Sequence, residues 1–524
     1  MVIVFVLVAL LVLAVVVTAN WYVWRRLFRD TTRGPGLTRR AGAVLIAGGW
    51  TLAITALVAE RSGAPFWLQQ VLAWPGFLWL ALSIYLLLAV VAGEVVRPLL
   101  RRYLDRRART RDGRQTDGGG AAPGSGTAPD PEAKGNGTPG ATTASATTAG
   151  PQANGAAGTP ATADGGVTAL AAQPGTAGAA TASVTPAPGT APTPAAQPGT
   201  AGAATASVTA PDPHEDDGAV ASGALAAAAP MPTATPTDPA TAAPGGAASG
   251  PSRRLFVSRV VAGAAAAAAV GTVGYGTYGV LRGPKVKRVT VPLAKLPRAA
   301  HGYRIAVVSD IHLGPVLGRG FAQKVVDTIN STQPDLIAVV GDLVDGSVKD
   351  LGPAAAPLAQ LRARHGSYFV TGNHEYFSGA EQWVEEVRRL GLNPLENARR
   401  EMPYFDLAGV NDVAGEEEGQ GPDFTRALGD RDTARACVLL AHQPVQIHEA
   451  VEHGVDLQLS GHTHGGQLWP GNLIASGANP TLAGLDRYGN TQLYVSRGAG
   501  AWGPPTRVGA PSDITLIELA SKQA

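Results

Sequence analysis

The chain has 524 residues, a formal net charge of +2 at pH 7 and one cysteine. A single cysteine excludes an intrachain disulfide. The nearly neutral net charge of the whole chain implies no nucleic-acid-binding surface. The composition is too uneven along the chain for its length alone to predict the number of domains. Cys437 lies in an apolar run, and we expect it to pack in the core of a strand.

Residues 1–114 are predicted to form a membrane module with three transmembrane helices. Val2 to Trp24 is uncharged and long enough to cross a hydrocarbon layer of about 30 Å. Ala41 to Ala59 and Pro65 to Gly93 are also uncharged. Pro75 is expected to separate an interfacial piece of the third segment from its spanning piece.

Arginines beside these helices indicate the orientation of the module. Six of them lie between Arg25 and Arg40, and a second cluster runs from Arg97 to Arg114, whereas the loop between the second and third helices contains only Arg61. The positive-inside rule therefore places the first loop and the segment after the third helix in the cytoplasm, with the N-terminus outside.

Residues 115–251 are expected to be a disordered linker. They contain no Phe, Trp or Tyr, and Ala, Gly, Thr and Pro dominate them. Such a segment cannot bury enough apolar area to offset its conformational entropy.

Residues 252–282 combine an arginine pair with a fourth predicted span, Val260 to Leu281. The sequence Ser252-Arg253-Arg254-Leu255-Phe256-Val257-Ser258 resembles a bacterial twin-arginine export signal, which implies the export machinery as a partner. Alternatively, the two arginines only mark the cytoplasmic end of a helix. Either interpretation places the chain from Lys285 onward outside a bacterial cell membrane, held by a span that stays uncleaved.

Residues 289–520 are predicted to form one α/β domain, because short apolar runs alternate with helical stretches. The expected strands are Ile305–Ser309, Leu336–Val340, Tyr368–Thr371, Val438–Ala441 and Leu457–Ser460. The expected helices are Phe321–Asn330, Ala354–Arg364, Glu381–Leu390 and Val445–His453.

Five short motifs that contain hard metal ligands follow these strands, at the positions where open α/β sheets usually carry their sites. They are Asp310-Ile311-His312, Gly341-Asp342, Gly372-Asn373-His374-Glu375, Ala441-His442 and Gly461-His462-Thr463-His464. One such motif would mean little, but five in order after strands are strong grounds for a metal site.

The order and spacing of the motifs are similar to those of the calcineurin-like metallophosphoesterases, and Gly461 to Gln467 resembles the YkuE-like membrane or exported branch. The resemblance implies a four-layer αββα sandwich and two divalent metal ions. Asp342 is expected to bridge the ions, because a shared carboxylate offsets their repulsion. By resemblance, one ion is completed by Asp310, His312 and His464, and the other by Asn373, His442 and His462. Oxygen and nitrogen donors without thiolate suit Mn, Fe, Zn or Co, and the sequence does not choose among them.

The metals are expected to make hydroxide available near neutral pH for in-line attack on phosphorus. His374 is then placed to protonate the leaving alkoxide or to bind the phosphate. Glu375 is expected to orient His374 or to cap the next helix, and Asp345 to support its loop rather than bind metal. Gly346 stands where protein phosphatases of the family carry a phosphate-binding arginine, which argues against protein dephosphorylation.

Three residues keep two interpretations each. Arg497 or Arg507 is expected either to bind a second phosphate group or to serve the structure. Trp469 is expected to pack in the core, with an apolar wall beside the metals as the alternative.

The predicted function is hydrolysis of phosphomonoesters or phosphodiesters, with lipid-linked or cell-envelope esters as candidate substrates. Two alternatives remain open. The chain could be a membrane scaffold or sensor with a phosphoesterase output domain, or a nucleotide phosphodiesterase that faces the cytoplasm.

Overall fold

The computed structural model describes residues 2–116 and 252–523. The linker predicted for residues 115–251 lies outside the described residues, apart from the two that end a helix. The C-terminal α/β part begins with a strand at Lys285 and ends with one at Ser521, close to the predicted limits 289 and 520. The division of the chain into domains otherwise stays a prediction.

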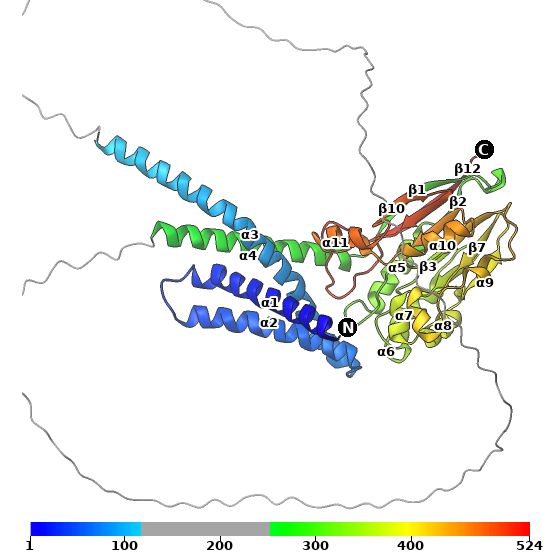
Figure 1. The fold of residues 1–524 in the computed structure, drawn as a ribbon, viewed down its shortest axis with the longest axis horizontal. Coiled ribbons are helices and arrows are strands. Elements are labelled where there is room, and N and C mark those ends of the chain that lie inside the picture. Colours follow the sequence, from blue (N-terminus) through cyan, green and yellow to red (C-terminus); the bar gives the residue numbers. More distant parts are fainter. Residues whose placement is uncertain (1, 117–251, 524) are drawn as a thin grey trace, which may run out of the picture. The chain divides into compact units, whose positions relative to one another are not determined.

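The four predicted spans are helices, and each is long and apolar enough to cross a membrane. A short π-helical segment, Arg25–Arg29, continues the first of them. In Figure 1 these helices are blue to cyan and, for the last, green. They are α1 (Val2–Trp24), α2 (Leu37–Arg61), α3 (Phe66–Thr116) and α4 (Arg253–Leu281).

Helix α3 runs without a break through Pro75 and Pro98, so the expected separation at Pro75 is wrong. Proline removes one backbone hydrogen bond and bends a helix, but neighbouring helices can hold the two halves in line. Ala73 and Phe77, on either side of Pro75, pack with Ala56 of α2. This packing explains why the helix continues.

Two six-stranded sheets form the α/β part. The first has the order β1 (Lys285–Leu293), β12 (Asp513–Ser521), β2 (Tyr303–Val308), β3 (Leu336–Val340), β4 (Ser367–Val370) and β5 (Asn393–Pro394). The second has the order β10 (Gly484–Tyr488), β11 (Thr491–Val495), β9 (Leu457–Ser460), β8 (Ala436–Leu440), β7 (Phe405–Gly409) and β6 (Ala398–Glu401). Cys437 is fully buried in β8, and burial raises the pKa of its thiol to about 12.

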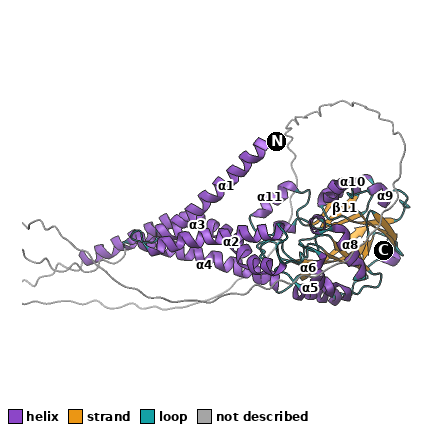
Figure 2. Ribbon diagram, turned by 90° about the horizontal axis from the view of Figure 1, so that it is seen from below, coloured by secondary structure: helices purple, strands orange, loops and turns teal. Residues whose placement is uncertain are grey.

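Three apolar cores separate four layers, which confirms the expected αββα sandwich. The central core joins the facing sides of the two sheets. The outer cores join the first sheet to α5, α6 and α8, and the second sheet to α9 and α10. Figure 2 shows the strands between α9 and α10 on one side and α5 and α6 on the other. The bounds are α5 (Arg319–Ser331), α6 (Val348–Ala355), α7 (Asn373–Ser378), α8 (Ala380–Arg389), α9 (Phe424–Leu428), α10 (Ile447–Glu452) and α11 (Gly471–Ala478).

The helix expected at Ala354–Arg364 begins earlier. Ser347 caps α6 by accepting a hydrogen bond from the backbone of Asp350, and a 3₁₀ turn, Ala356–Gln360, completes the helical stretch. The capping serine, rather than the alanine run, sets the start of this helix.

Parallel pairing places the five candidate ligand motifs at one edge of each sheet. Strands β2, β3 and β4 are mutually parallel, as are β7, β8 and β9. The carboxyl ends of parallel strands meet at the same edge, so residues after β2, β3, β4, β8 and β9 come together there although they are far apart in the chain.

Candidate metal centre

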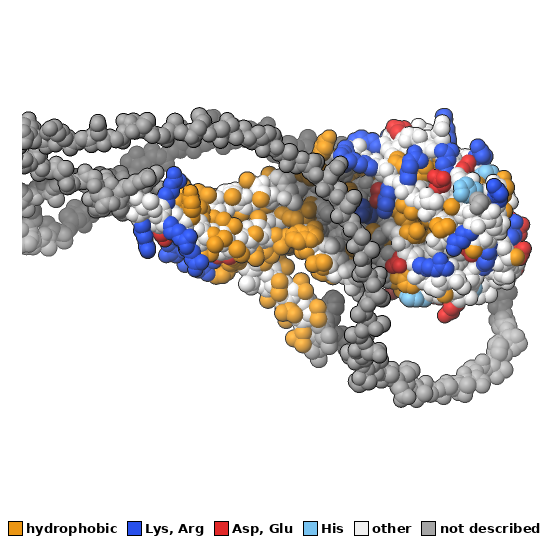
Figure 3. All heavy atoms as spheres, turned by 90° about the horizontal axis from the view of Figure 1, so that it is seen from above, with side chains coloured by type: hydrophobic (Ala, Val, Ile, Leu, Met, Phe, Trp, Pro, Cys, Tyr) orange, Lys and Arg blue, Asp and Glu red, His pale blue; other side chains and the backbone are white. Residues whose placement is uncertain are grey.

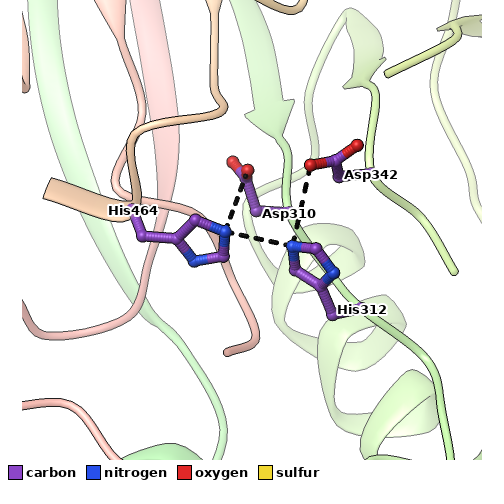
Figure 4. A group of neighbouring side chains, drawn as sticks. All are labelled: Asp310, His312, Asp342 and His464. Atoms are coloured by element: carbon purple, nitrogen blue, oxygen red, sulfur yellow. Dashed lines mark hydrogen bonds and ion pairs between the residues drawn. The ribbon is translucent and has the colours of Figure 1, made fainter. Parts of the chain in front are cut away.

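One group of buried side chains joins the motifs after β2, β3 and β9. His312 and His464 point their Nε2 atoms at each other, 3.0 Å apart. His464 Nε2 also lies 3.4 Å from Asp310 Oδ1, and His312 Nε2 lies 3.8 Å from Asp342 Oδ2. Figure 4 shows the four side chains converging on one point. This is the set that the sequence assigned to the first ion and the bridge.

A second group shares Asp342. His442 Nε2 lies 3.1 Å from Asp342 Oδ2, on the carboxylate that the first group also uses. His462 Nδ1 lies 3.0 Å from Asn373 Oδ1. Asp342, His442 and His462 offer donor atoms within 4.8 Å of one another. The structure therefore brings together all seven predicted ligands in two groups joined at Asp342, and their assignment as ligands stays a prediction.

Two buried polar atoms in these groups have no hydrogen-bond partner among the described residues: Asp310 Oδ2 and His442 Nε2. Nδ1 of His442 donates to the carbonyl of Val340 at 2.9 Å, so Nε2 is the ring nitrogen that faces the shared carboxylate of Asp342. A buried atom of this kind carries a desolvation penalty unless something binds it. Divalent cations fit both atoms, and the oxygen and nitrogen donor set suits Mn, Fe, Zn or Co without selecting one.

Electrostatics couple Asp342 to His442. Burial opposes the charged form of both side chains, but their mutual attraction outweighs it. The pKa of the Asp342 carboxyl is therefore held well below its usual range, and the pKa of His442 well above. A site that keeps its bridging carboxylate ionised is prepared for cations.

Backbone strain concentrates at these positions. Five of the seven predicted ligands have positive φ angles between 48° and 71°, namely Asp310, His312, Asp342, His462 and His464. Non-glycine residues pay roughly 1–2 kcal/mol for this left-handed conformation, which persists only where the surroundings impose it. Such clustering is typical of a functional site.

Glycines in two of the motifs leave room for the carboxylates. A Cβ atom on Gly461 would lie 2.5 Å from Asp310 Oδ2, and one on Gly372 would overlap Asp342 Oδ1. Backbone N–H groups then fix the same carboxylates: His462 donates to Asp310, and His374 to Asp342, each at 2.9 Å.

Asp345 links two histidines that the sequence treated separately. Its Oδ1 accepts from Nδ1 of His312 at 2.8 Å and from Nδ1 of His374 at 2.7 Å. Burial disfavours both charged forms, but the contact with Asp345 raises the pKa of His374 to about 9, and the two histidines lower the pKa of Asp345 to about 2. Asp345 therefore does more than support its loop, because it orients His312 and His374 together.

Glu375 caps the start of α7 rather than orienting His374. Its buried carboxylate accepts from the backbone N–H groups of Asp342, Leu343 and Gly372, at 2.9, 2.8 and 2.6 Å. It therefore ties the turn after β3 to the start of α7. Of the two interpretations drawn from the sequence, the cap agrees with the contacts, and the orienting acid is Asp345.

The two arginines considered as phosphate ligands differ in exposure. Arg507 is 6% exposed, and its guanidinium donates to the carbonyl oxygens of Gly500, His464 and Ala510. Burial lowers its pKa to about 10. Its position is structural, since it holds the loop of His464. Arg497 has a side chain 35% exposed and lies 4.0 Å from Asp513.

Exposed aromatic side chains surround His374. Phe377 and Trp502 meet its ring edge-on, with centroids 5.6 and 5.8 Å away, and are 68% and 51% exposed. Trp469 is 52% exposed, so its expected burial in the core is wrong. Sequence reasoning missed Phe377 and Trp502. Phe377 lies three residues after His374 in α7 and could have been found by helical spacing, whereas no local pattern points to Trp502.

Two stacked mixed sheets with carboxylate, amide and imidazole groups at their strand ends define the metal-dependent phosphoesterase class of fold and site. A family model described as calcineurin-like phosphoesterase matches residues 303–466. An uncharacterized metallophosphoesterase of Aquifex aeolicus is 35% identical over 243 residues, which cover 45% of this chain and 92% of that protein. The chain belongs to the calcineurin-like metallophosphoesterase family.

Two further relatives place the match in context. The Bacillus subtilis metallophosphoesterase YkuE is 29% identical over 280 residues, covering 52% of this chain and 98% of the relative. A zebrafish protein called transmembrane protein with metallophosphoesterase domain is 40% identical over 264 residues, covering 48% of this chain and 60% of that protein. The match thus spans about 60% of the length of the zebrafish relative. The resemblance drawn from the sequence motifs is confirmed.

Proposed function

We propose that this chain is a membrane-associated hydrolase of phosphate esters. The observation that carries the proposal is the meeting of two donor groups on one carboxylate, Asp342. We assign the first ion to Asp310, His312 and His464, and the second to Asn373, His442 and His462. Bound divalent ions supply activation of a water molecule and neutralise charge on the phosphate.

His374 is the proposed catalytic residue. Its Nδ1 donates to Asp345, so Nε2 is the atom left to give a proton to the leaving oxygen or to bind a phosphate oxygen. The T-shaped packing of Phe377 and Trp502 limits rotation of the ring. Asp345 acts through His374 and His312, and is therefore a positioning residue. Gly346 follows it, so the site lacks the arginine that would favour phosphoprotein substrates.

A lipid-linked ester is the substrate class that the surroundings support best. The loop of Val316 packs on Ala56, Ala73 and Phe77, which belong to α2 and α3. Tyr85 of α3 donates to the carbonyl of Trp469 at 2.9 Å, five residues after the ligand His464. The metal centre thus lies beside helices that are apolar enough to enter a bilayer.

Exposed apolar residues extend from the site. Leu473 and Ile474 on α11 are 67% and 81% exposed, and α11 packs against the turn that contains His464. Together with Trp469, Phe377 and Trp502 they form what we call the apolar rim. Such a surface suits acyl or prenyl chains that lead a phosphate to the metals.

The proposed orientation places the metal centre outside a bacterial cell. Arg259 at the start of α4 donates to the carbonyl of Thr31, and Arg26 pairs with Glu94 of α3. The arginine-rich segments therefore gather at one end of the helices, and the positive-inside rule favours the cytoplasm for that end. The motif at Ser252 opens α4, where the Ser252 side chain caps the helix.

The test uses the full chain in detergent or nanodiscs, loaded with Mn²⁺, on bis-aryl phosphate, mono-aryl phosphate and a phosphatidate-type ester. The double variant Leu473→Ser, Ile474→Ser removes two apolar contacts of about 1.5–3 kcal/mol each at full burial. We expect it to lower kcat/KM for the lipid ester at least tenfold and to leave the aryl esters unchanged. Leu485→Ser, 42% exposed on β10, is the matched control.

The possible results separate the two levels of the proposal. No activity above that of Asp342→Asn on any ester would reject the hydrolase. Activity on aryl esters alone, or an equal loss on all esters in the rim variant, would reject only the lipid-linked substrate.

A further inference from the structure

An arginine-lined pocket lies at the end of the helices where the basic segments gather. It has a volume of about 380 Å³ and is lined by seven arginines from the π-helical segment, the first loop, α2, α3 and α4. Figure 3 shows Lys and Arg side chains (blue) gathered at one end of helices that are otherwise covered by hydrophobic side chains. The pocket takes no part in the chemistry proposed above.

The charges in the pocket are not balanced. Apart from Arg33, six arginines line the pocket, and two carboxylates of the described residues lie beside them: Asp30, which lines the pocket, and Glu94, which pairs with Arg26 and Arg97 at 2.8 and 2.9 Å. Arg26 also pairs with Asp30 at 2.9 Å. In the described part of the chain, Arg29, Arg101 and Arg254 have no carboxylate within ion-pair distance. Like charges this close repel one another, and a bound anion would offset that repulsion.

Arg97 is a buried arginine on the wall of the pocket with a hydrogen-bond donor that the described part of the chain leaves unused. It is 5% exposed, lies on the wall of the pocket, and its Nε has no hydrogen-bond partner among the described residues. Nε of Arg26 also has no hydrogen-bond partner in the described ranges. A buried guanidinium with an unused donor is costly, and an oxyanion in the pocket is the ligand that would satisfy it.

The start of α4 adds a further attraction. Ser252, Arg254 and Leu255 line the pocket at the N-terminus of this 29-residue helix. The positive end of the helix dipole favours an anion there. The pocket therefore combines side-chain charges with a helix end.

We propose that this pocket binds a phosphate-bearing anion that carries at least two negative charges. Phosphate oxygens match the fork of several guanidinium groups arriving from different directions. The volume is near the lower end of ordinary ligand pockets, roughly 300–1,000 Å³, so it admits a phosphate or diphosphate while the rest of the ligand stays outside. The source is either a phospholipid headgroup of the adjacent leaflet or a soluble phosphate compound.

The bound anion has a structural consequence. Helix α4 leads to the catalytic part, whereas Arg97 and Arg101 belong to α3 and Arg26 to the segment after α1. An anion shared among them joins α4 to the other helices and offsets the repulsion between them. Occupancy should therefore raise the thermal stability of the full chain.

The experiment compares the full chain in nanodiscs of pure phosphatidylcholine, in nanodiscs with phosphatidic acid, and in the pure discs with added pyrophosphate. We expect the unfolding midpoint to rise with one of the two anions, and its half-saturation concentration to increase about tenfold or more in Arg29→Gln and in Arg101→Gln. Both side chains are exposed and belong to none of the three ion pairs described above, so the variants should fold.

Arg102→Gln is the matched control, an exposed arginine on α3 that does not line the pocket. A response to phosphatidic acid alone identifies a lipid headgroup, and a response to pyrophosphate identifies a soluble ligand. No response to either anion, or the same loss in Arg102→Gln as in the pocket variants, would overturn the proposal, because only diffuse surface attraction would then remain. Neither result bears on phosphoesterase activity.

Discussion

Replacing Asp345 tests whether one carboxylate serves both the first ion and the catalytic histidine. Asp345→Ala removes the acceptor of the Nδ1 protons of His312 and His374, at 2.8 and 2.7 Å. Hydrogen bonds to a charged group contribute roughly 1.5–3 kcal/mol each. Loss of the bond to His312 should therefore lower Mn²⁺ affinity roughly ten- to a hundredfold, as is usual for partners that orient a ligand.

The effect on His374 should appear separately in kcat. At saturating Mn²⁺ we expect Asp345→Ala to reduce kcat by about 10²-fold, as loss of a positioned acid commonly does. Asp345→Asn keeps an acceptor oxygen without the charge, and its kcat should lie between those of the unchanged chain and Asp345→Ala. Asp327→Ala, an exposed aspartate of α5, is the control and should change neither quantity.

The assay combines calorimetric Mn²⁺ titration of the metal-free chain with aryl phosphate turnover. His374→Ala should lower kcat while leaving Mn²⁺ affinity unchanged. Because Asp345 acts on kcat through His374, Asp345→Ala should have little further effect on kcat in the His374→Ala background. Unchanged Mn²⁺ affinity in Asp345→Ala, or fully additive kcat losses in the double variant, would refute the reasoning.

Two further predictions concern the turns that hold the ligands. Glu375→Gln replaces a carboxylate that accepts from three backbone N–H groups with an amide that has one acceptor oxygen. The free energy of unfolding should fall by about 1–3 kcal/mol per unsatisfied donor, measured as a lower unfolding midpoint. An unchanged midpoint would show that the cap contributes nothing. Gly461→Ala places a Cβ atom 2.5 Å from Asp310 Oδ2 and should reduce bound metal per chain, measured by elemental analysis. Gly320→Ala in α5, where the Cβ meets open space, should keep its full metal content, and equal contents in both variants would contradict the argument.

The local pattern of the sequence determined the elements and the identity of the candidate ligands. Short apolar runs predicted β3 and β9 at their exact bounds, and β2, β4 and β8 within two residues, because buried parallel strands are continuously apolar. Charge-free stretches predicted α1 at its exact bounds and the end of α4 at Leu281, whereas α4 begins before the predicted Val260, at Arg253. The helix after Asp345 was misplaced, because a cap at Ser347 outweighed the alanine run.

Only the tertiary structure decided how distant side chains meet. Asp345 joins His312 to His374, Trp502 covers His374 from a loop after β11, and Trp469 is exposed where burial was expected. None of these contacts has a local signature, since each depends on the register of parallel strands and on the packing of loops between elements. The motifs thus indicated which residues could bind metal, and the fold determined which of them share a carboxylate, which histidine is oriented, and what surface surrounds the site.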